Sequence, residues 1–206
     1  MLSPILEKCL AHVPSSKFRR WAVLERPVGA KLADAAGSGL ALELREVMPP
    51  QVALLKGVNA YCDDNAAPCR RFQKGNRCFI AELCGEPVFY AWVLFNDTES
   101  PLYLPARADM HVHVILLPYW AYLWDTWTKE NCRGRGIQPS AIELLSPLLG
   151  ERGCKGLMAL VNVNNRSSMR AFAKSKFTQQ RVLTHLRLFG CDLVLGTYAP
   201  REKNDL

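Results

Sequence analysis

The sequence predicts an α/β (α+β) protein with a mixed β-sheet, and two observations carry this prediction. Apolar and polar residues alternate at the start of residues 40–47, and several other short segments are rich in aromatic and β-branched residues, as strands are. Residues 119–128 and 157–163 are two such segments, and an apolar-periodic helix lies between them. Because a strand, a helix and a strand at this spacing form a crossover, we expect these two strands to be parallel.

The first part of the chain, residues 1–39, is expected to be an extension that is packed on the core or linked to it. It is expected to hold a short helix over 3–12, a short strand over 21–25 and a loop rich in Ala and Gly over 29–39. The domain is expected to span 40–200 and to be followed by a polar tail over 201–206. Its strands are expected at 40–47, 78–83, 88–95, 110–117, 119–128, 157–163, 177–188 and 193–198.

Helices are expected over 50–61, where Pro50 falls in the first turn, and from residues 138 and 165 onward. Residues 97–108, which contain two prolines, are expected to be a loop. In the helix from residue 138, Pro147 removes an internal hydrogen bond and clashes with the preceding turn. We therefore expect a kink at Pro147, or the end of the regular helix by Ser146.

Residues 132–138, Cys-Arg-Gly-Arg-Gly-Ile-Gln, form a basic, glycine-rich turn directly before this helix. Such a turn offers unpaired backbone N–H groups and the positive end of the helix dipole to a phosphate group. A P-loop is excluded because no Lys-Ser or Lys-Thr follows Gly136, and Pro139 breaks the dinucleotide-binding fingerprint. Cys132, beside the turn, is either a nucleophile or a small residue that fits there.

Length and composition indicate a globular protein of 206 residues, with one domain or a domain and an extension. Hydrophobic residues make up 49%, and the longest nearly unbroken apolar run, 114–124, is too short to span a bilayer. The first fifteen residues lack the apolar core of a signal peptide, so we expect a cytoplasmic protein without a membrane partner. The eight cysteines include no Cys-x-x-Cys pair and no nearby His cluster, so we expect no metal.

The glycine-rich turn belongs to a wider pattern. Residues 133–138 resemble the acyl-CoA signature of the GNAT superfamily, Arg/Gln-x-x-Gly-x-Gly/Ala, and residues 165–177 are similar to the family's second signature. Residues 78–83 and 88–93 resemble its paired antiparallel strands, joined by a hairpin that contains Gly85. The resemblance covers residues 40–200. It implies the GNAT-like acyl-CoA N-acyltransferase fold, a central mixed, mostly antiparallel sheet flanked by helices.

Three residues depart from the family pattern. Gln138 replaces the last Gly/Ala of the first signature. At this position the family's backbone comes close to the pyrophosphate, and here that position has a larger side chain. Phe172 stands where many relatives have the Tyr that protonates the leaving thiolate, and a Phe has no proton to give. Lys176 replaces the Gly before Phe177, which is expected to alter only a helix C-cap.

The resemblance implies a set of residues that bind acetyl-CoA, the expected co-substrate. They are Trp127, Thr128, Arg133, Gly134, Arg135, Gly136, Ile137, Gln138, Asn165, Ser168, Phe172 and Lys174. Asn165 is implied to hydrogen-bond near the pantetheine, although Asn is also an ideal helix N-cap, and both roles are compatible. Arg166, Arg170 and Lys174 share a helix face, which is either a solvated basic stripe or a contact to the 3′-phosphate.

The catalytic candidates are Tyr122 and Asp125, in the strand before the turn. Strict alternation would place Tyr122, Trp124 and Thr126 on one face and Asp125 and Trp127 on the other, unless a bulge intervenes. Tyr122 is a hydroxyl donor but, with an ordinary pKa of about 10, a weak base at neutral pH. Asp125 is the carboxylate of that strand. The further candidate bases are His111, His113 and Glu82, each of which also has a purely structural interpretation.

The function that this pattern favours is transfer of an acetyl group from acetyl-CoA to a primary amine acceptor. The alternative is a GNAT-fold module that binds acyl-CoA without turnover, which the Phe at position 172 keeps open. The net charge of +7 suits CoA and also nucleic acid, but the basic residues are dispersed and no nucleic-acid-binding signature is present, so that partner is not expected. The sequence is compatible with a homodimer. The acceptor stays open between a small amine, an amino sugar and a protein N-terminus.

Overall fold

The computed structural model describes residues 18–29, 40–59, 66–107, 110–188 and 191–196. The described helices are the 3-10 turns η2 (Pro49–Gln51) and η3 (Glu130–Cys132) and the α-helices α2 (Leu54–Val58), α3 (Ala66–Gln73), α4 (Ile137–Glu151) and α5 (Arg166–Lys174). The strands are β1 (Phe18–Pro27), β2 (Leu42–Val47), β3 (Arg77–Leu83), β4 (Glu86–Phe95), β5 (Leu102–Arg107), β6 (Met110–Leu116), β7 (Trp120–Thr128), β8 (Gly156–Asn162), β9 (Thr178–Leu188) and β10 (Cys191–Leu195).

Eight of the described strands form one sheet in the order β10-β9-β1-β8-β7-β4-β3-β2, and β5 pairs with β6 separately. Within the described sheet, β7 and β8 are parallel, and the other neighbouring strands are antiparallel. The mixed, mostly antiparallel sheet with flanking helices confirms the expected fold class. The helix α4 connects the two parallel strands, which confirms the predicted crossover.

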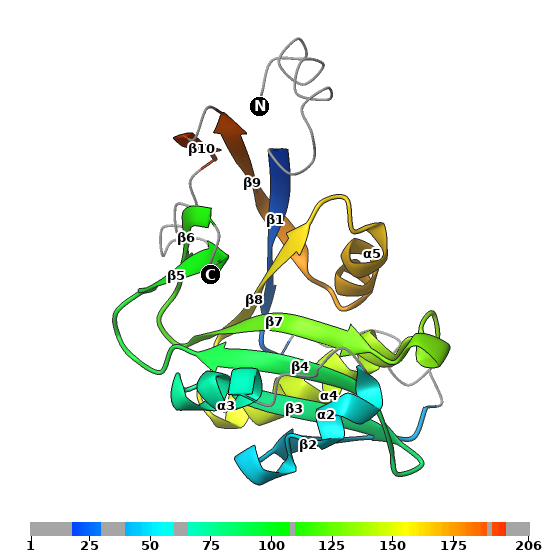
Figure 1. Ribbon diagram of the computed structural model, residues 1–206. Helices are drawn as coiled ribbons and strands as arrows, with labels where there is room; N and C mark the ends of the chain where they lie inside the picture. Colours follow the sequence, from blue (N-terminus) through cyan, green and yellow to red (C-terminus); the bar gives the residue numbers. More distant parts are fainter. Residues whose placement is uncertain (1–17, 30–39, 60–65, 108–109, 189–190, 197–206) are drawn as a thin grey trace.

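The sheet opens at its parallel pair. β7 and β8 pair only from Trp120 with Gly156 to Leu123 with Ala159, although both strands continue beyond that point. In Figure 1, β7, β4, β3 and β2 lie across the lower part of the molecule, while β8, β1 and β9 rise away from them. The strands thus diverge and leave a slot between the second half of β7 and the end of β8.

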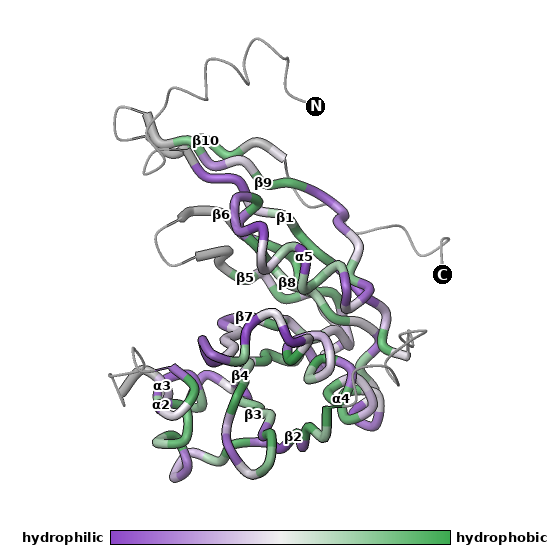
Figure 2. Tube along the Cα trace, turned by 90° about the vertical axis from the view of Figure 1, so that its right-hand side faces the viewer, coloured by the Kyte–Doolittle hydropathy of each residue, from purple (hydrophilic) through white to green (hydrophobic). Residues whose placement is uncertain are grey.

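Hydrophobic residues cover both faces of this sheet. On one face, α4 and α5 pack over residues such as Ala121, Leu123, Leu157 and Ala159. On the other face, α2 packs on β3 and β4, and the β5–β6 pair packs on β1 and β8. Figure 2 shows hydrophobic colouring concentrated on central strands such as β4. The slot therefore lies between two packed layers.

Several expected element boundaries are wrong, and packing explains them. The helix expected over 50–61 is divided into η2 and the short α2. Part of the loop expected over 97–108 is the strand β5, which has one strand neighbour and so tolerates Pro105. The helix α4 continues through the exposed Pro147, because Leu145 before it and Leu149 after it are both buried in the core.

The expected boundary at residue 40 separates β1 from the domain, whereas β1 lies inside the sheet between β9 and β8. The strand expected at 21–25 is present but longer. Arg26 of β1 is fully buried and pairs with Glu143 of α4 at 2.7 Å. This ion pair also joins β1 to the helix layer that packs on the sheet. The helix expected over 3–12 lies outside the described residues.

Candidate functional site

The glycine-rich turn ends at the N-terminus of α4. Gly134 and Gly136 have φ angles of +78° and +81°, a left-handed conformation that favours glycine. A Cβ built on either residue would have no atom within 4 Å, so the space beside both glycines is open. The first N–H groups of α4 have no acceptor within the helix. The turn therefore has open space and unpaired donors where an anionic group can bind.

An open cleft of about 600 Å³ lies beside this turn, between the end of β7 and α5. All the predicted cofactor residues except Arg135 and Phe172 line it. The structure adds lining residues that the signature did not indicate: Thr126, Cys132, Pro139, Ser167, Arg170 and Ala171. The helix face that Arg170 shares with Lys174 already indicated Arg170. Cys132, Pro139 and Ser167 are next in sequence to residues of the two signatures, and Thr126 precedes Trp127 by one position.

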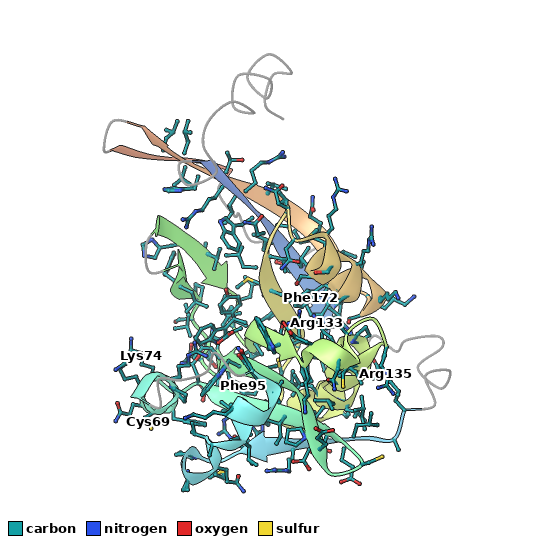
Figure 3. All side chains as sticks on the ribbon, turned by 45° about the vertical axis from the view of Figure 1, so that its right-hand side comes forward. Cys69, Lys74, Phe95, Arg133, Arg135 and Phe172 are labelled. Carbon is teal, nitrogen blue, oxygen red and sulfur yellow. The ribbon has the colours of Figure 1, made fainter. Side chains whose placement is uncertain are left out.

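The side chains around the cleft are held by local contacts. The guanidinium of Arg133 lies 5.0 Å from the ring centroid of Trp127, and its Nε donates to the carbonyl of Thr128 at 3.2 Å. Asn165 caps α5, because its Oδ1 accepts from the backbone N–H of Ser168 at 3.1 Å. Arg135, which is labelled in Figure 3, is exposed to solvent.

A β-bulge interrupts β7 in the middle of the site. Trp124 is opposite Trp92 of β4 and Trp127 is opposite Tyr90, so β7 has one residue more than β4 over this stretch. Asp125, in the bulge, has a φ of +42°. Trp124 and Trp127 consequently pack against the same cluster of residues. The strict alternation that would place them on opposite faces is therefore wrong, because the bulge adds one residue to β7 between them.

A second cavity of about 200 Å³ occupies the slot between β7 and β8. Thr126, Asn165 and Ser168 line both this cavity and the larger cleft, so the two adjoin. The other residues of the slot are Trp21, Leu123, Trp124, Asp125, Leu160, Val161, Asn162 and Phe172. The structure thus places a second, smaller cavity directly beside the cleft at the glycine-rich turn.

Asp125 is the ionisable residue among the described side chains that line the slot. Its carboxylate forms an ion pair with Arg71 of α3. The Arg71 guanidinium lies over the rings of Trp92 and Trp124, at 5.0 and 4.6 Å from their centroids. Asn76 accepts a hydrogen bond from Nε1 of Trp124 at 3.0 Å. The bulge, α3 and two indoles together fix this carboxylate in place.

The other predicted catalytic residues lie elsewhere. Tyr122 lines neither cavity, and burial raises its pKa to about 12. Glu82 pairs with Arg45 of β2 at 2.7 Å, and His113 is exposed on β6. The side chain of His111 lies outside the described residues. The structure therefore brings Asp125 into the slot and leaves Tyr122, Glu82 and His113 outside it.

Phe172 lines the slot from α5 and is 3% exposed. Its ring is packed edge to face against Phe177, with centroids 4.9 Å apart. The hydroxyl-bearing side chains at the slot are those of Thr126 and Ser168, which also face the larger cleft. Any proton that a protein side chain donates to a leaving group here has to come from a residue other than Phe172.

The sequence model of the acetyltransferase (GNAT) family matches residues 45–177. This range is more than half of the chain, so the protein belongs to that family. The resemblance seen in the two signatures is thereby confirmed. No protein of curated function matches the chain.

Solved structures share the fold at low sequence identity. A functionally unknown conserved protein from Staphylococcus epidermidis ATCC 12228 is 8% identical, with a TM-score of 0.58, over 89% of this chain and 66% of that one. A GNAT-family acetyltransferase from Colwellia psychrerythraea is 13% identical, with a TM-score of 0.55, over 87% of this chain and 59% of that one. A glucosamine N-acetyltransferase region of a fungal multi-domain GH3 β-N-acetylglucosaminidase is 11% identical, with a TM-score of 0.57, over 87% of this chain and 22% of that one.

Each of these neighbours is longer than the part that this chain matches, and the chain spans less than two thirds of its length. What they share with this chain is the fold. Among the described residues, no group of three or more His, Cys, Asp or Glu side chains is arranged to hold a metal ion. No helix in the described part of the chain is long and apolar enough to cross a membrane.

Proposed function

We propose that this protein transfers the acetyl group of acetyl-CoA to a primary amine. The observation that carries the proposal is the continuity of two spaces: a phosphate-accepting cleft at the start of α4 adjoins a small slot between two diverging parallel strands. A CoA thioester has the same order of parts, with phosphates at one end and a small acyl group at the other. Membership of the GNAT family supports this assignment.

The turn would hold the phosphates. Gly134 and Gly136 leave room beside the N-terminus of α4, and the dipole of a helix of this length attracts negative charge at that end. Arg170 and Lys174 line the same cleft from α5, so positive charge is present on two sides. The proposal thus assigns the pyrophosphate to the turn and the 3′-phosphate to the α5 side.

The open edge of β7 would hold the pantetheine arm. From Trp124 to Thr128, β7 has no pairing with β8, so the backbone groups on that edge are available to the amides of the arm. Asn165, at the junction of cleft and slot, offers an amide as well. A chamber of about 200 Å³ at the end of this path is suited to a short acyl group such as acetyl.

The chemistry requires a neutral amine whose nitrogen attacks the thioester carbonyl, so that a C–N bond forms and the C–S bond breaks. The amine must lose a proton, and the departing thiolate must be stabilised or protonated. Asp125 is placed to bind the incoming ammonium form and to pass its proton to water. Thr126 and Ser168 can donate hydrogen bonds to the departing sulfur, in place of the Tyr that is absent at position 172.

Phe172 favours a second candidate, a module that binds acyl-CoA without turnover. Two measurements separate the candidates: calorimetric affinity for acetyl-CoA, and amine-dependent release of the free CoA thiol against a panel of amines. Binding with amine-dependent thiol release is the expected result. Binding without release by any amine supports the module, and no binding at all overturns both.

A further inference from the structure

We propose that Arg71 binds an anionic group of the acceptor, so that the amine acetylated by this protein carries a carboxylate or a phosphate close to its amino group. This inference rests on the proposed function and adds the chemical class of its acceptor. It is carried by the position of Arg71, which contacts two residues that line the slot, Asp125 and Trp124.

The arrangement lies where an acceptor would arrive. The cleft assigned to CoA is lined by α4 and α5, which cover one face of the sheet. Arg71 belongs to α3 and contacts Trp92 and Trp124, which pack on the opposite face with α2. An acceptor that reaches the slot from the face free of CoA therefore passes Arg71 before it meets the thioester.

The guanidinium of Arg71 is held in place and still has free donors. Two indoles and the Asp125 carboxylate contact it, and Nδ2 of Asn76 donates to its backbone carbonyl at 3.1 Å. Its hydrogen bond to Asp125 uses Nη1, and within the described part of the chain Nε and Nη2 have no partner. The side chain is 27% exposed. A planar guanidinium with two open N–H groups is suited to a carboxylate or phosphate.

The surrounding charge is positive. The described sequence of α3 contains Arg70 and Arg71 and no acidic residue, and Lys74 follows it directly. Figure 3 shows Lys74 at the outer side of this helix. These cations attract an anionic ligand toward the slot. Among the described residues, a simple cationic amine would meet the Asp125 carboxylate with the Arg71 guanidinium in contact with it.

The contact between Arg71 and Asp125 also limits the distance between the amino group and the anionic group of the acceptor. Because the Arg71 and Asp125 side chains are in direct contact, a ligand that engages both must carry its ammonium and its anionic group within a few bonds of each other. Amino acids and short aminoalkyl phosphates have this layout. The ammonium would lie against Asp125, beside the thioester, and the anion against the outer donors of Arg71.

Matched amine pairs test the inference. Phenylalanine is compared with phenethylamine, and phosphoethanolamine with ethanolamine, by kcat/KM for amine-dependent thiol release from acetyl-CoA. The wild-type protein is expected to prefer an anionic member by at least about tenfold, because a hydrogen bond between two charged groups is stronger than one between neutral groups. Whichever pair shows the preference identifies the anion as carboxylate or phosphate.

Arg71→Met is expected to abolish this preference, because KM rises for the anionic amine and not for the neutral one, while acetyl-CoA affinity stays nearly unchanged. Loss of the partner of Asp125 is expected to lower kcat for both amines alike, so the ratio of their kcat/KM values is the readout. Arg77→Met is the matched control, because Arg77 also lies over an aromatic ring (Phe95, 5.8 Å) and pairs with a carboxylate (Glu46, 3.0 Å), but these two partners line neither cavity. Should Arg71→Met not fold, Arg71→Gln replaces it.

Equal rates for both members of each pair, or a preference that survives in the Arg71 variant, overturn the inference and leave the acetyltransferase proposal standing. A purely structural role for Arg71 would lower stability and both rates together, without changing their ratio. Absence of thiol release with every amine overturns the proposed function itself, and the inference with it.

Discussion

Phe172 and Phe177 stand at the two ends of the turn that terminates α5, with their rings edge to face and the backbone N–H of Phe177 bonded to the carbonyl of Phe172 at 3.1 Å. A second bond joins the N–H of Lys176 to the carbonyl of Ala173 at 3.0 Å. These are the two hydrogen bonds and the apolar contact of a Schellman motif. The motif places Lys176 in the left-handed region, at a φ of +62°.

The same motif ends α4, where glycine occupies the equivalent position. Gly153 has a φ of +75°, and Cys154 donates to the carbonyl of Leu149 at 3.0 Å. Because a left-handed conformation costs a side-chain-bearing residue about 1 kcal/mol or more, Lys176→Gly is expected to stabilise the protein by about 1 kcal/mol. Gly153→Lys is the reciprocal variant and is expected to destabilise it by a similar amount. Urea unfolding measures both, and a Lys176→Gly protein no more stable than the wild type contradicts the prediction.

The glycine-rich turn yields a prediction about the affinity for acetyl-CoA. Gly136→Glu places a side chain and a negative charge in the open space beside the start of α4. We expect it to lower acetyl-CoA affinity by at least about a hundredfold, since charge and volume both oppose the pyrophosphate. Calorimetry measures the affinity.

Gly85→Glu is the matched control for Gly136→Glu. Gly85 has a φ of +78° and open space around it, so its variant carries a similar backbone strain, but it lies in the β3–β4 hairpin away from the cleft. Affinity that falls equally in both variants would point to strain rather than to the site, and unchanged affinity in Gly136→Glu would remove the phosphate assignment.

The basic residues of α5 are expected to matter less than the turn. Arg170 and Lys174 are exposed, and exposed charge contacts are worth about 1 kcal/mol or less. Lys174→Ala should weaken CoA by about fivefold or less and dephospho-CoA hardly at all, if the 3′-phosphate binds there. Arg166→Ala is the control, because Arg166 is exposed on the same helix but does not line the cleft. Equal losses for the two ligands would leave this helix face as a solvated stripe.

Tyr122 yields a prediction about alkaline pH. Burial raises its pKa from 10.0 to about 12, so the unfolded state ionises at a lower pH than the folded state. The stability from this neutral hydroxyl is fully present below pH 10 and is lost between pH 10 and 12, at up to about 1.4 kcal/mol per pH unit. Because Tyr122→Phe has no hydroxyl that can ionise, its stability should fall less than that of the wild type between pH 10 and 12.

The same variant also tests the role of Tyr122 in the reaction. Because Tyr122 lines neither cavity, we expect Tyr122→Phe to retain kcat within about threefold, below the roughly hundredfold effect typical of a general acid or base. Asp125→Asn is expected to lower kcat at least about tenfold, with acetyl-CoA affinity maintained. A tenfold or larger loss of kcat in Tyr122→Phe would contradict this and indicate that the Tyr122 hydroxyl takes part in the reaction.

The glycine-rich turn was predictable because its cause is local. Gly134 and Gly136 have positive φ angles, so the backbone itself selects the residue type that the sequence displays. The crossover was predictable for the same reason, since the apolar periodicity of α4 follows the strand residues directly. Local pattern and local structure coincide in these segments.

The slot could not be predicted in the same way, because it depends on contacts between distant segments. The bulge at Asp125 is a mismatch between β7 and β4, and no property of the β7 residues alone requires it. The partner of Asp125 comes from α3, and Trp21 enters the slot from β1. The place of β1 inside the sheet depends on partners from β8 and β9, near the other end of the chain, which the residues of β1 do not indicate.

This placement of β1 has a consequence for synthesis of the chain on the ribosome. Trp21 pairs with Asn162 and Leu183, so β1 has no neighbour to bind until β8 and β9 have emerged. The strands from β2 to β7 pair with neighbours that are synthesised close in time. The strands β2, β3, β4 and β7 can therefore pair first. Until β8 and β9 follow, the apolar side chains of β1 are not packed against them. Among the described strands, β1 is therefore the first to be synthesised and one of the last to be paired.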